Sequence, residues 1–181
     1  MSLFIWAYLL FRLLSVIFVS MGQNKYPKLN LPNAPLKIRE EDGVLKVYDA
    51  LRGKFVTLTP EEYVRQHFVN WLQTGLNYPL SLMANEIGIE LNGMCKRCDT
   101  VVFRPDGNPL MIIEYKAPDV EITQDVFDQI VRYNMVLRAS YLVVSNGRQH
   151  YCCVIDYTGN SYNFIREIPS YDSIRTPFSS N

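Results

Sequence analysis

The sequence lacks an excess of charge of either sign. Eighteen lysines and arginines balance eighteen aspartates and glutamates over 181 residues. A strongly basic chain would have indicated a nucleic-acid-binding surface; a neutral chain gives no such indication, although a local basic patch can still exist. Only four cysteines are present, which is too few for a small secreted domain held together by disulfides. We therefore expect a reducing compartment, in the simplest case the cytoplasm.

The sequence also lacks internal repeats, low-complexity segments and a GxxxxGK[ST] phosphate loop. We therefore expect no ATP binding through such a loop, and a chain of this length suits one domain with a real core. The cysteines form one Cys-x2-Cys pair, Cys95 and Cys98, and one adjacent pair, Cys152 and Cys153. Neighbours on a strand point to opposite faces, so we expect buried free thiols rather than a zinc or iron–sulfur site.

Residues 1–21 form an apolar leader that is interrupted by Arg12. Its length would suffice to span a bilayer and tether the domain to a membrane, although a central arginine costs about 2.5–3.5 kcal/mol there. A signal peptide is disfavoured because no lysine or arginine precedes the apolar run. Met21 is followed at once by polar residues, which favours a mis-called start over an anchor. In each case the functional domain is expected to follow residue 21.

The rest of the chain divides by composition into three parts. Residues 22–35 hold three prolines and predict an extended lead-in. Residues 36–169 carry the periodic apolar patterns of the domain, and residues 170–181 predict a C-terminal tail, as a loop or fraying terminus. Within residues 36–58, short strand-like runs around an Asp-Gly turn predict a small β-hairpin or meander.

Two segments predict helices. The first begins with Thr59 as the N-cap, Pro60 at the first helical position and Glu62 at the third, which is a capping box, and it ends at Gly75. Its apolar residues recur at helical spacing, at Val64, Phe68, Trp71 and Leu72. The second has Thr123 as the N-cap. Its shared apolar face comprises Val126, Ile130, Tyr133 and Leu137.

Between and after the helices lie five predicted strands. The first alternates apolar and polar residues over 85–91, and the next two form a hairpin over 98–116. The last two follow the second helix, at 140–145 and 150–157. The order helix, three strands, helix, two strands predicts an α/β fold in which a mixed central β-sheet is flanked by helices on both faces.

The hairpin, CDTVVFRPDGNPLMIIEYK, carries charges among apolar strand residues. If its turn is centred between Asp106 and Gly107, Asp99 lies opposite Glu114 and Lys116 shares their face. Two carboxylates at that distance repel each other unless a cation or a shared proton lies between them. Mg²⁺ prefers oxygen ligands of this kind, and a neighbouring lysine can serve a metal-activated water in phosphodiester hydrolysis. Spacing alone equally allows an ion pair without catalytic function.

The sequence around this hairpin resembles a known family. Asp99 followed by Glu114-Tyr115-Lys116 resembles the D–(E/D)xK pattern of restriction-endonuclease-like nucleases. The stretches TPEEYVRQ, NEIGIEL, KRCDTVVF, IIEYKAP, FDQIVRYN and YLVVSNGRQHY, within residues 36–156, resemble the N-terminal nuclease domain of type I restriction enzyme R subunits. Gln129 and Tyr133 resemble the additional Gln-x3-Tyr motif of RecB-like nucleases.

The resemblance implies a PD-(D/E)xK core with an N-terminal β-hairpin. It implies that Asp99 and Glu114, with the backbone carbonyl of Tyr115, hold Mg²⁺ or alternatively Mn²⁺. Lys116 would serve the attacking water. Gln129 and Tyr133 would orient the site or contact the DNA backbone. Glu62 is a further candidate ligand, although a capping box explains a glutamate at that position equally well.

The expected function is therefore that of an Mg²⁺-dependent DNA endonuclease module without the ATPase motor of full R subunits. The expected partners are DNA and restriction–modification subunits, with a membrane only if the leader is genuine. The alternative is a catalytically silent domain of the same fold that binds nucleic acid or a partner protein. The intact triad of Asp99, Glu114 and Lys116 favours the nuclease.

Overall fold

The computed structural model describes residues 26–91, 93–159 and 161–175. The predicted leader lies outside these residues. In the part of the chain that is described, no helix has the length and apolarity needed to cross a membrane.

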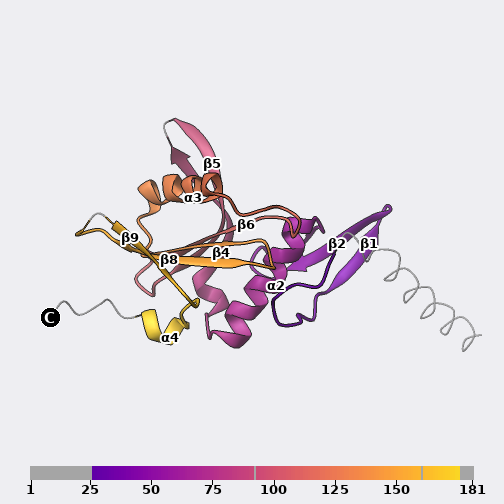
Figure 1. Cartoon of the computed structure of the whole chain (residues 1–181). Coiled ribbons are helices and arrows are strands. Elements are labelled where there is room, and N and C mark those ends of the chain that lie inside the picture. Colours follow the sequence, from indigo (N-terminus) through magenta and orange to yellow (C-terminus); the bar gives the residue numbers. More distant parts are fainter. Residues whose placement is uncertain (1–25, 92, 160, 176–181) are drawn as a thin grey trace, which may run out of the picture.

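A six-stranded sheet in the order β4-β5-β6-β7-β8-β9 forms the centre of the molecule (Figure 1). Its strands are β4 (Met83–Leu91), β5 (Met94–Phe103), β6 (Pro109–Tyr115), β7 (Tyr141–Ser145), β8 (His150–Asp156) and β9 (Ser161–Ile165). A separate small sheet holds β1 (Ile38–Glu41), β2 (Val44–Asp49) and β3 (Lys54–Thr57). The helices are α2 (Pro60–Gly75), the 3-10 turn η1 (Leu80–Leu82), α3 (Gln124–Leu137) and α4 (Tyr171–Ile174).

The predicted mixed α/β topology is confirmed. Strands β4, β5 and β6 form an antiparallel meander, and β7 lies parallel to β6 because α3 crosses over between them. The small sheet is the predicted N-terminal meander, with β2 in its centre. Strand β9 was not predicted, because the Ser161–Ile165 segment is short and largely exposed and so lacks a buried alternating face.

Helix α2 begins as its capping signals predict. The Thr59 hydroxyl accepts a hydrogen bond from the Glu62 N–H at 3.1 Å, and Pro60 occupies the first turn. In a full capping box the Glu62 carboxylate would accept the Thr59 N–H in return. Here the Thr59 N–H donates instead to the Thr57 carbonyl at 3.0 Å. The Glu62 carboxylate is buried and makes other contacts, which are described with the site.

Thr59→Ala removes this cap. We expect the free energy of unfolding to fall by about 1 kcal/mol, which corresponds to a melting temperature lower by roughly 2–4 °C in a chain of this size. Thr74→Ala on the same helix is the matched control, since that exposed hydroxyl bonds only to the Asn70 carbonyl one turn back. Thermal unfolding followed by circular dichroism measures both variants. Equal destabilisation by the two substitutions would contradict the capping role of Thr59.

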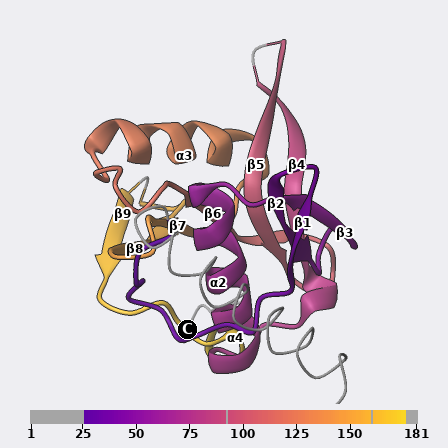
Figure 2. The same cartoon turned by 90° about the vertical axis from the view of Figure 1, so that its right-hand side faces the viewer.

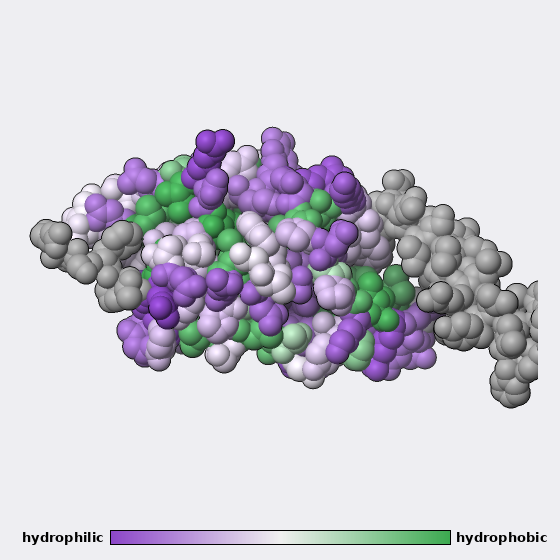
Figure 3. Space-filling view, turned by 90° about the horizontal axis from the view of Figure 1, so that it is seen from below, coloured by the Kyte–Doolittle hydropathy of each residue, from purple (hydrophilic) through white to green (hydrophobic). Residues whose placement is uncertain are grey.

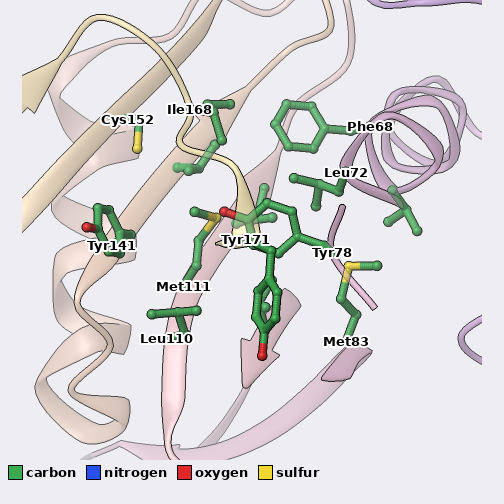
Figure 4. Packing of buried hydrophobic residues seen from close by; sticks show 14 of the residues in the cluster. Phe68, Leu72, Tyr78, Met83, Leu110, Met111, Tyr141, Cys152, Ile168 and Tyr171 are labelled. Carbon is green, nitrogen blue, oxygen red and sulfur yellow. The ribbon is translucent and has the colours of Figure 1, made fainter. Parts of the chain in front are cut away.

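Each face of the sheet is covered by one long helix. Phe68 and Leu72 of α2 pack with Met111 of β6 and with buried residues from the C-terminal segment, as Figure 4 shows. On the opposite face, Phe127 and Ile130 of α3 pack on the sheet. The fold thus confirms the expectation of a sheet buried on both sides.

The C-terminal prediction needs correction at residues 171–174. These residues form α4 rather than a loop, and Tyr171 and Ile174 are buried in the core on the α2 side. The Tyr171 ring lies 5.5 Å from the ring of Tyr78, between ring centroids, and the Tyr171 N–H donates to the Leu76 carbonyl at 2.8 Å. An apolar pair spaced by three residues is too short a pattern to separate such a helical turn from a tail.

The β4–β5 hairpin projects beyond the rest of the sheet (Figure 2). Lys96 and Arg97 lie exposed on this projection. On the face seen in Figure 3, hydrophobic residues form separate patches among hydrophilic ones. The four cysteines are free, as predicted, and Cys98, Cys152 and Cys153 are buried. The prediction of burial is wrong for Cys95, which is exposed on the projecting β4–β5 hairpin.

Candidate functional site

The predicted register of the charged hairpin is correct from Thr100 to Val102, but it shifts by one residue between Val102 and Phe103, beside the turn. Val101 pairs with Ile112, and Thr100 pairs with Ile113, which leaves Asp99 and Glu114 as the next opposing residues. At this point the ladder between β5 and β6 ends. One oxygen of the Asp99 carboxylate, Oδ2, accepts the backbone N–H of Tyr115 at 2.8 Å. The Asp99 side chain therefore bridges the two strands where they separate.

Glu114 is buried at the end of β6, with 5% of its surface exposed. Its Oε1 atom accepts two hydrogen bonds, one from Lys116 Nζ at 3.1 Å and one from Gln129 Nε2 at 2.8 Å. Its Oε2 atom is buried and has no hydrogen-bond partner. A buried carboxylate oxygen without a donor is costly, so a partner for Oε2 would stabilise this group.

Gln129 and Tyr133 join this cluster from α3. They lie one helical turn apart, and Gln129 Nε2 also contacts the Tyr133 hydroxyl at 3.1 Å. The structure thus brings Glu114, Lys116, Gln129 and Tyr133 into one hydrogen-bonded group next to Asp99. Their functional roles stay predictions.

The surroundings of Asp99 and Glu114 disfavour the ionised form of both carboxyl groups. Burial, reinforced by the nearby charge of Asp99, raises the pKa of Glu114 to about 7. Burial also raises the pKa of Asp99, against the opposing effect of the Arg65 guanidinium. Holding both groups ionised without a further cation is therefore unfavourable.

Arg65 of α2 is a site residue that the sequence analysis missed. Its guanidinium is buried, and it contacts Asp99 Oδ1 through NH2 at 2.8 Å and Glu86 Oε1 through NH1 at 2.6 Å. These acidic partners raise the pKa of Arg65 in spite of its burial. The sequence did contain a signal that Arg65 is buried. It lies next to Val64 and one helical turn before Phe68 and Val69, on the apolar side of α2.

Glu62 contacts the site through this arginine. Its Oε1 atom accepts from Arg52 NH2 at 2.6 Å and from Gln66 Nε2 at 2.7 Å, while Oε2 lies 3.5 Å from Arg65 NH1. Arg65 thus lies between the carboxylates of Glu62 and Asp99. The structure places Glu62 among arginine and amide donors, and a role as a metal ligand stays a prediction.

A second buried network ties the small sheet to the same region. Asp49, which is 1% exposed, pairs with Arg52 and accepts from Asn85 Nδ2 at 2.8 Å. The Thr100 hydroxyl donates to Asn85 Oδ1 at 2.6 Å, one residue after Asp99. Burial opposes the ionised form of Asp49, but the donors from Asn85 and Arg52 outweigh it and lower its pKa. The contacts of Asn85 with Asp49 and with Thr100 were not predicted, because they join residues 36 and 15 positions apart in the chain.

The oxygen atoms of this site suit a hard divalent cation. Asp99 and Glu114 supply carboxylates, and the free Oε2 atom of Glu114 supplies an acceptor without a donor. Among the residues with described positions, no group of three or more His, Cys, Asp or Glu could hold a metal ion. A cation here would therefore complete its shell with a backbone carbonyl, as predicted for Tyr115, and with water or substrate oxygens.

The family model for the type I restriction enzyme R protein N terminus (HSDR_N) matches residues 60–169. A solved fragment assigned to an HsdR subunit of a type I restriction enzyme from Vibrio vulnificus YJ016 matches with 18% identity and a TM-score of 0.48. The match covers 65% of this chain and 24% of that chain, so this chain corresponds to about a quarter of that relative. No curated protein matches.

Proposed function

The chain belongs to the family of type I restriction enzyme R protein N termini, and we propose that it is a metal-dependent DNA nuclease module with a PD-(D/E)xK core. One observation carries the proposal. Where β5 and β6 separate, Asp99 and Glu114 lie at opposing positions and Lys116 contacts Glu114. A buried acid and a half-buried acid beside a lysine, with one oxygen of Glu114 unpartnered, match the needs of phosphodiester hydrolysis better than those of a structural ion pair.

Asp99 and Glu114, with the backbone carbonyl of Tyr115, would hold Mg²⁺ or alternatively Mn²⁺. When bound, such an ion supplies Lewis-acid stabilisation of the phosphate and an acidified water. The protein's own contribution is to hold Asp99 in place through the Tyr115 N–H and to place the Glu114 carboxylate in a buried position.

The Lys116 ammonium is held 3.1 Å from Glu114 Oε1 by the end of β6, where the Lys116 N–H donates to the Ser145 carbonyl. In this position it can orient an attacking water and balance developing negative charge on the phosphate. Gln129 fixes the Glu114 carboxylate from α3, and Tyr133 supports Gln129. These two residues would orient the site or contact the DNA backbone.

The proposed partners are DNA and, by family, the other subunits of a restriction–modification system. The proposed location is the cytoplasm. Because the sequence has no GxxxxGK[ST] loop, ATP-driven translocation is not part of the proposal. The rival function is a catalytically silent domain that binds nucleic acid or a partner protein, and the following experiment separates the two.

The substitution Lys116→Met tests directly whether the domain is a nuclease. The full chain is incubated with supercoiled plasmid and Mg²⁺ or Mn²⁺, and nicking is followed by gel electrophoresis. We expect Lys116→Met to slow cleavage by roughly 10²-fold or more, because a positioned group that serves proton transfer contributes about 10²–10⁴. Lys54→Met, which changes an exposed lysine of β3, is expected to cleave at the wild-type rate. Equal cleavage by all three proteins, or none by the wild type with either metal, would leave only the silent binding domain.

A further inference from the structure

The Arg65 guanidinium lies among acidic side chains from three elements. Glu62 comes from its own helix, Glu86 from β4 and Asp99 from β5, at 3.5, 2.6 and 2.8 Å respectively. Arginine remains charged at every accessible pH, and its planar fork can hold two carboxylates at once. Arg65 uses NH1 for Glu86 and NH2 for Asp99 in this way.

These contacts fix the orientation of Asp99. Its Oδ1 atom is held by Arg65 from α2, and its Oδ2 atom is held by the Tyr115 N–H of β6. Each oxygen thus has a donor from a different element, so the carboxylate cannot rotate without losing a hydrogen bond. The Arg65 guanidinium also lies 5.7 Å from the centroid of the Tyr115 ring, which ties the arginine to the same strand.

Glu86 holds Arg65 in place from a left-handed backbone position. Its φ of 59° lies in the left-handed region, which is uncommon and strained for a residue with a side chain. Its Oε1 atom contacts Arg65, and its Oε2 atom contacts the exposed Arg97 at 3.2 Å. Strain that persists beside a candidate site indicates that the surrounding structure fixes this conformation.

On the basis of the proposed metal-dependent function, we propose that Arg65 is a positioning residue that orients Asp99 and lowers the affinity of the site for a divalent cation. Its buried positive charge lies directly beside the carboxylate that would bind the ion. A cation that approaches Asp99 is therefore repelled by Arg65 in a region that water screens poorly. The two effects can be tested separately. The orientation of Asp99 depends on the forked shape of the Arg65 guanidinium, whereas the affinity for a divalent cation depends on its positive charge.

The effect on affinity is tested with Arg65→Met, which removes the charge and keeps most of the volume. Mn²⁺ binding to the full chain is measured by isothermal titration calorimetry in the absence of DNA. We expect Arg65→Met to bind Mn²⁺ roughly tenfold more tightly than the wild type, a change equivalent to about 1.4 kcal/mol. Arg97→Met is the matched control, because it removes an exposed charge from the other oxygen of Glu86, and its affinity should stay within about threefold.

The effect on orientation is tested with Arg65→Lys, which keeps the charge and loses the fork. Mn²⁺ affinity should stay within about threefold of the wild type, while kcat for plasmid cleavage falls roughly tenfold or more at unchanged KM. A purely structural role predicts instead a lower melting temperature with unchanged Mn²⁺ affinity in Arg65→Met. If Arg65→Met does not fold, wild-type kcat in Arg65→Lys would by itself overturn the proposal.

The outcomes separate this inference from the proposed function. If the wild type and a folded Arg65→Met both fail to bind Mn²⁺, the metal site and the proposed function fall together. If the wild type binds Mn²⁺ and Arg65→Met binds it no more tightly, or Arg97→Met gains as much, only the role of Arg65 is refuted.

Discussion

Asp99→Asn is expected to abolish metal-dependent DNA cleavage, with a loss of at least about 10³-fold. The amide keeps the size of the side chain and can still accept the Tyr115 N–H through its oxygen. It removes the negative charge that would bind the cation and that now faces Arg65 at 2.8 Å. Since electrostatic stabilisation is usually the largest single contribution to catalysis, the lost charge should outweigh the preserved shape.

The control for this substitution lies on the same hairpin. Asp106 in the turn is exposed, and its carboxylate accepts hydrogen bonds from the Asn108 N–H at 2.9 Å and from Asn108 Nδ2 at 3.0 Å, both within the turn. Asp106→Asn should therefore cleave plasmid at the wild-type rate. Initial rates of nicking at several Mg²⁺ concentrations measure both variants. Cleavage by Asp99→Asn at a tenth of the wild-type rate or faster would remove Asp99 from the catalytic site.

Glu114→Gln is expected to have opposite effects on activity and on stability. Cleavage should fall by roughly 10³-fold, because the buried carboxylate is replaced by a neutral amide. The metal-free protein, however, should become more stable at pH 8. Burial raises the pKa of Glu114 from 4.5 to about 7, so its ionised form is unfavourable in the folded state. Removing that charge should increase the free energy of unfolding by roughly 1–3 kcal/mol.

The pH dependence follows from the direction of this shift. Because the pKa of Glu114 is higher in the folded than in the unfolded state, its protonated form contributes stability below about pH 4.5. That contribution is lost as the pH rises through about 7. Burial lowers the pKa values of the buried His67 and the half-buried His150, which acts in the opposite direction over part of this range. The difference between wild type and Glu114→Gln isolates the contribution of Glu114.

Urea unfolding of both proteins in EDTA, from pH 4.5 to pH 8, measures this difference. We expect it to be smallest at the acid end and to grow toward pH 8, in favour of Glu114→Gln. Mn²⁺ should stabilise the wild type and have little effect on the variant. A variant that is less stable than the wild type at pH 8 in EDTA would show that the Glu114 carboxylate stabilises the fold.

The sequence alone predicted those parts of the fold that depend on local patterns. Thr59 and Pro60 fixed the start of α2, because cap and first-turn preferences act within a few residues. The apolar faces of the hairpin strands set the register that brings Asp99 opposite Glu114, whereas the one-residue shift between Val102 and Phe103 was not predicted. The spacing of Gln129 and Tyr133 placed both on one side of α3, where they meet.

Other features escaped prediction because their signal is weak or not local. Strand β9 has little buried surface, and α4 offers only Tyr171 and Ile174 as an apolar pattern. The small sheet docks through Asp49 and Arg52, which read as ordinary turn residues in the sequence. Asp49 is buried and bonds to Asn85, 36 residues away in the chain, and Arg52 contacts Glu62 of α2.

By itself the sequence determined the elements, the mixed topology and the acids and lysine of the hairpin. Only the tertiary structure placed Arg65 on Asp99, across 34 residues, and left Glu114 Oε2 without a donor. The physical reason is that periodicity and turn chemistry act over a few residues, whereas the state of a buried charge depends on every group that the fold brings within a few ångströms. The sequence thus predicted which groups could act, and the fold decided which charges face one another.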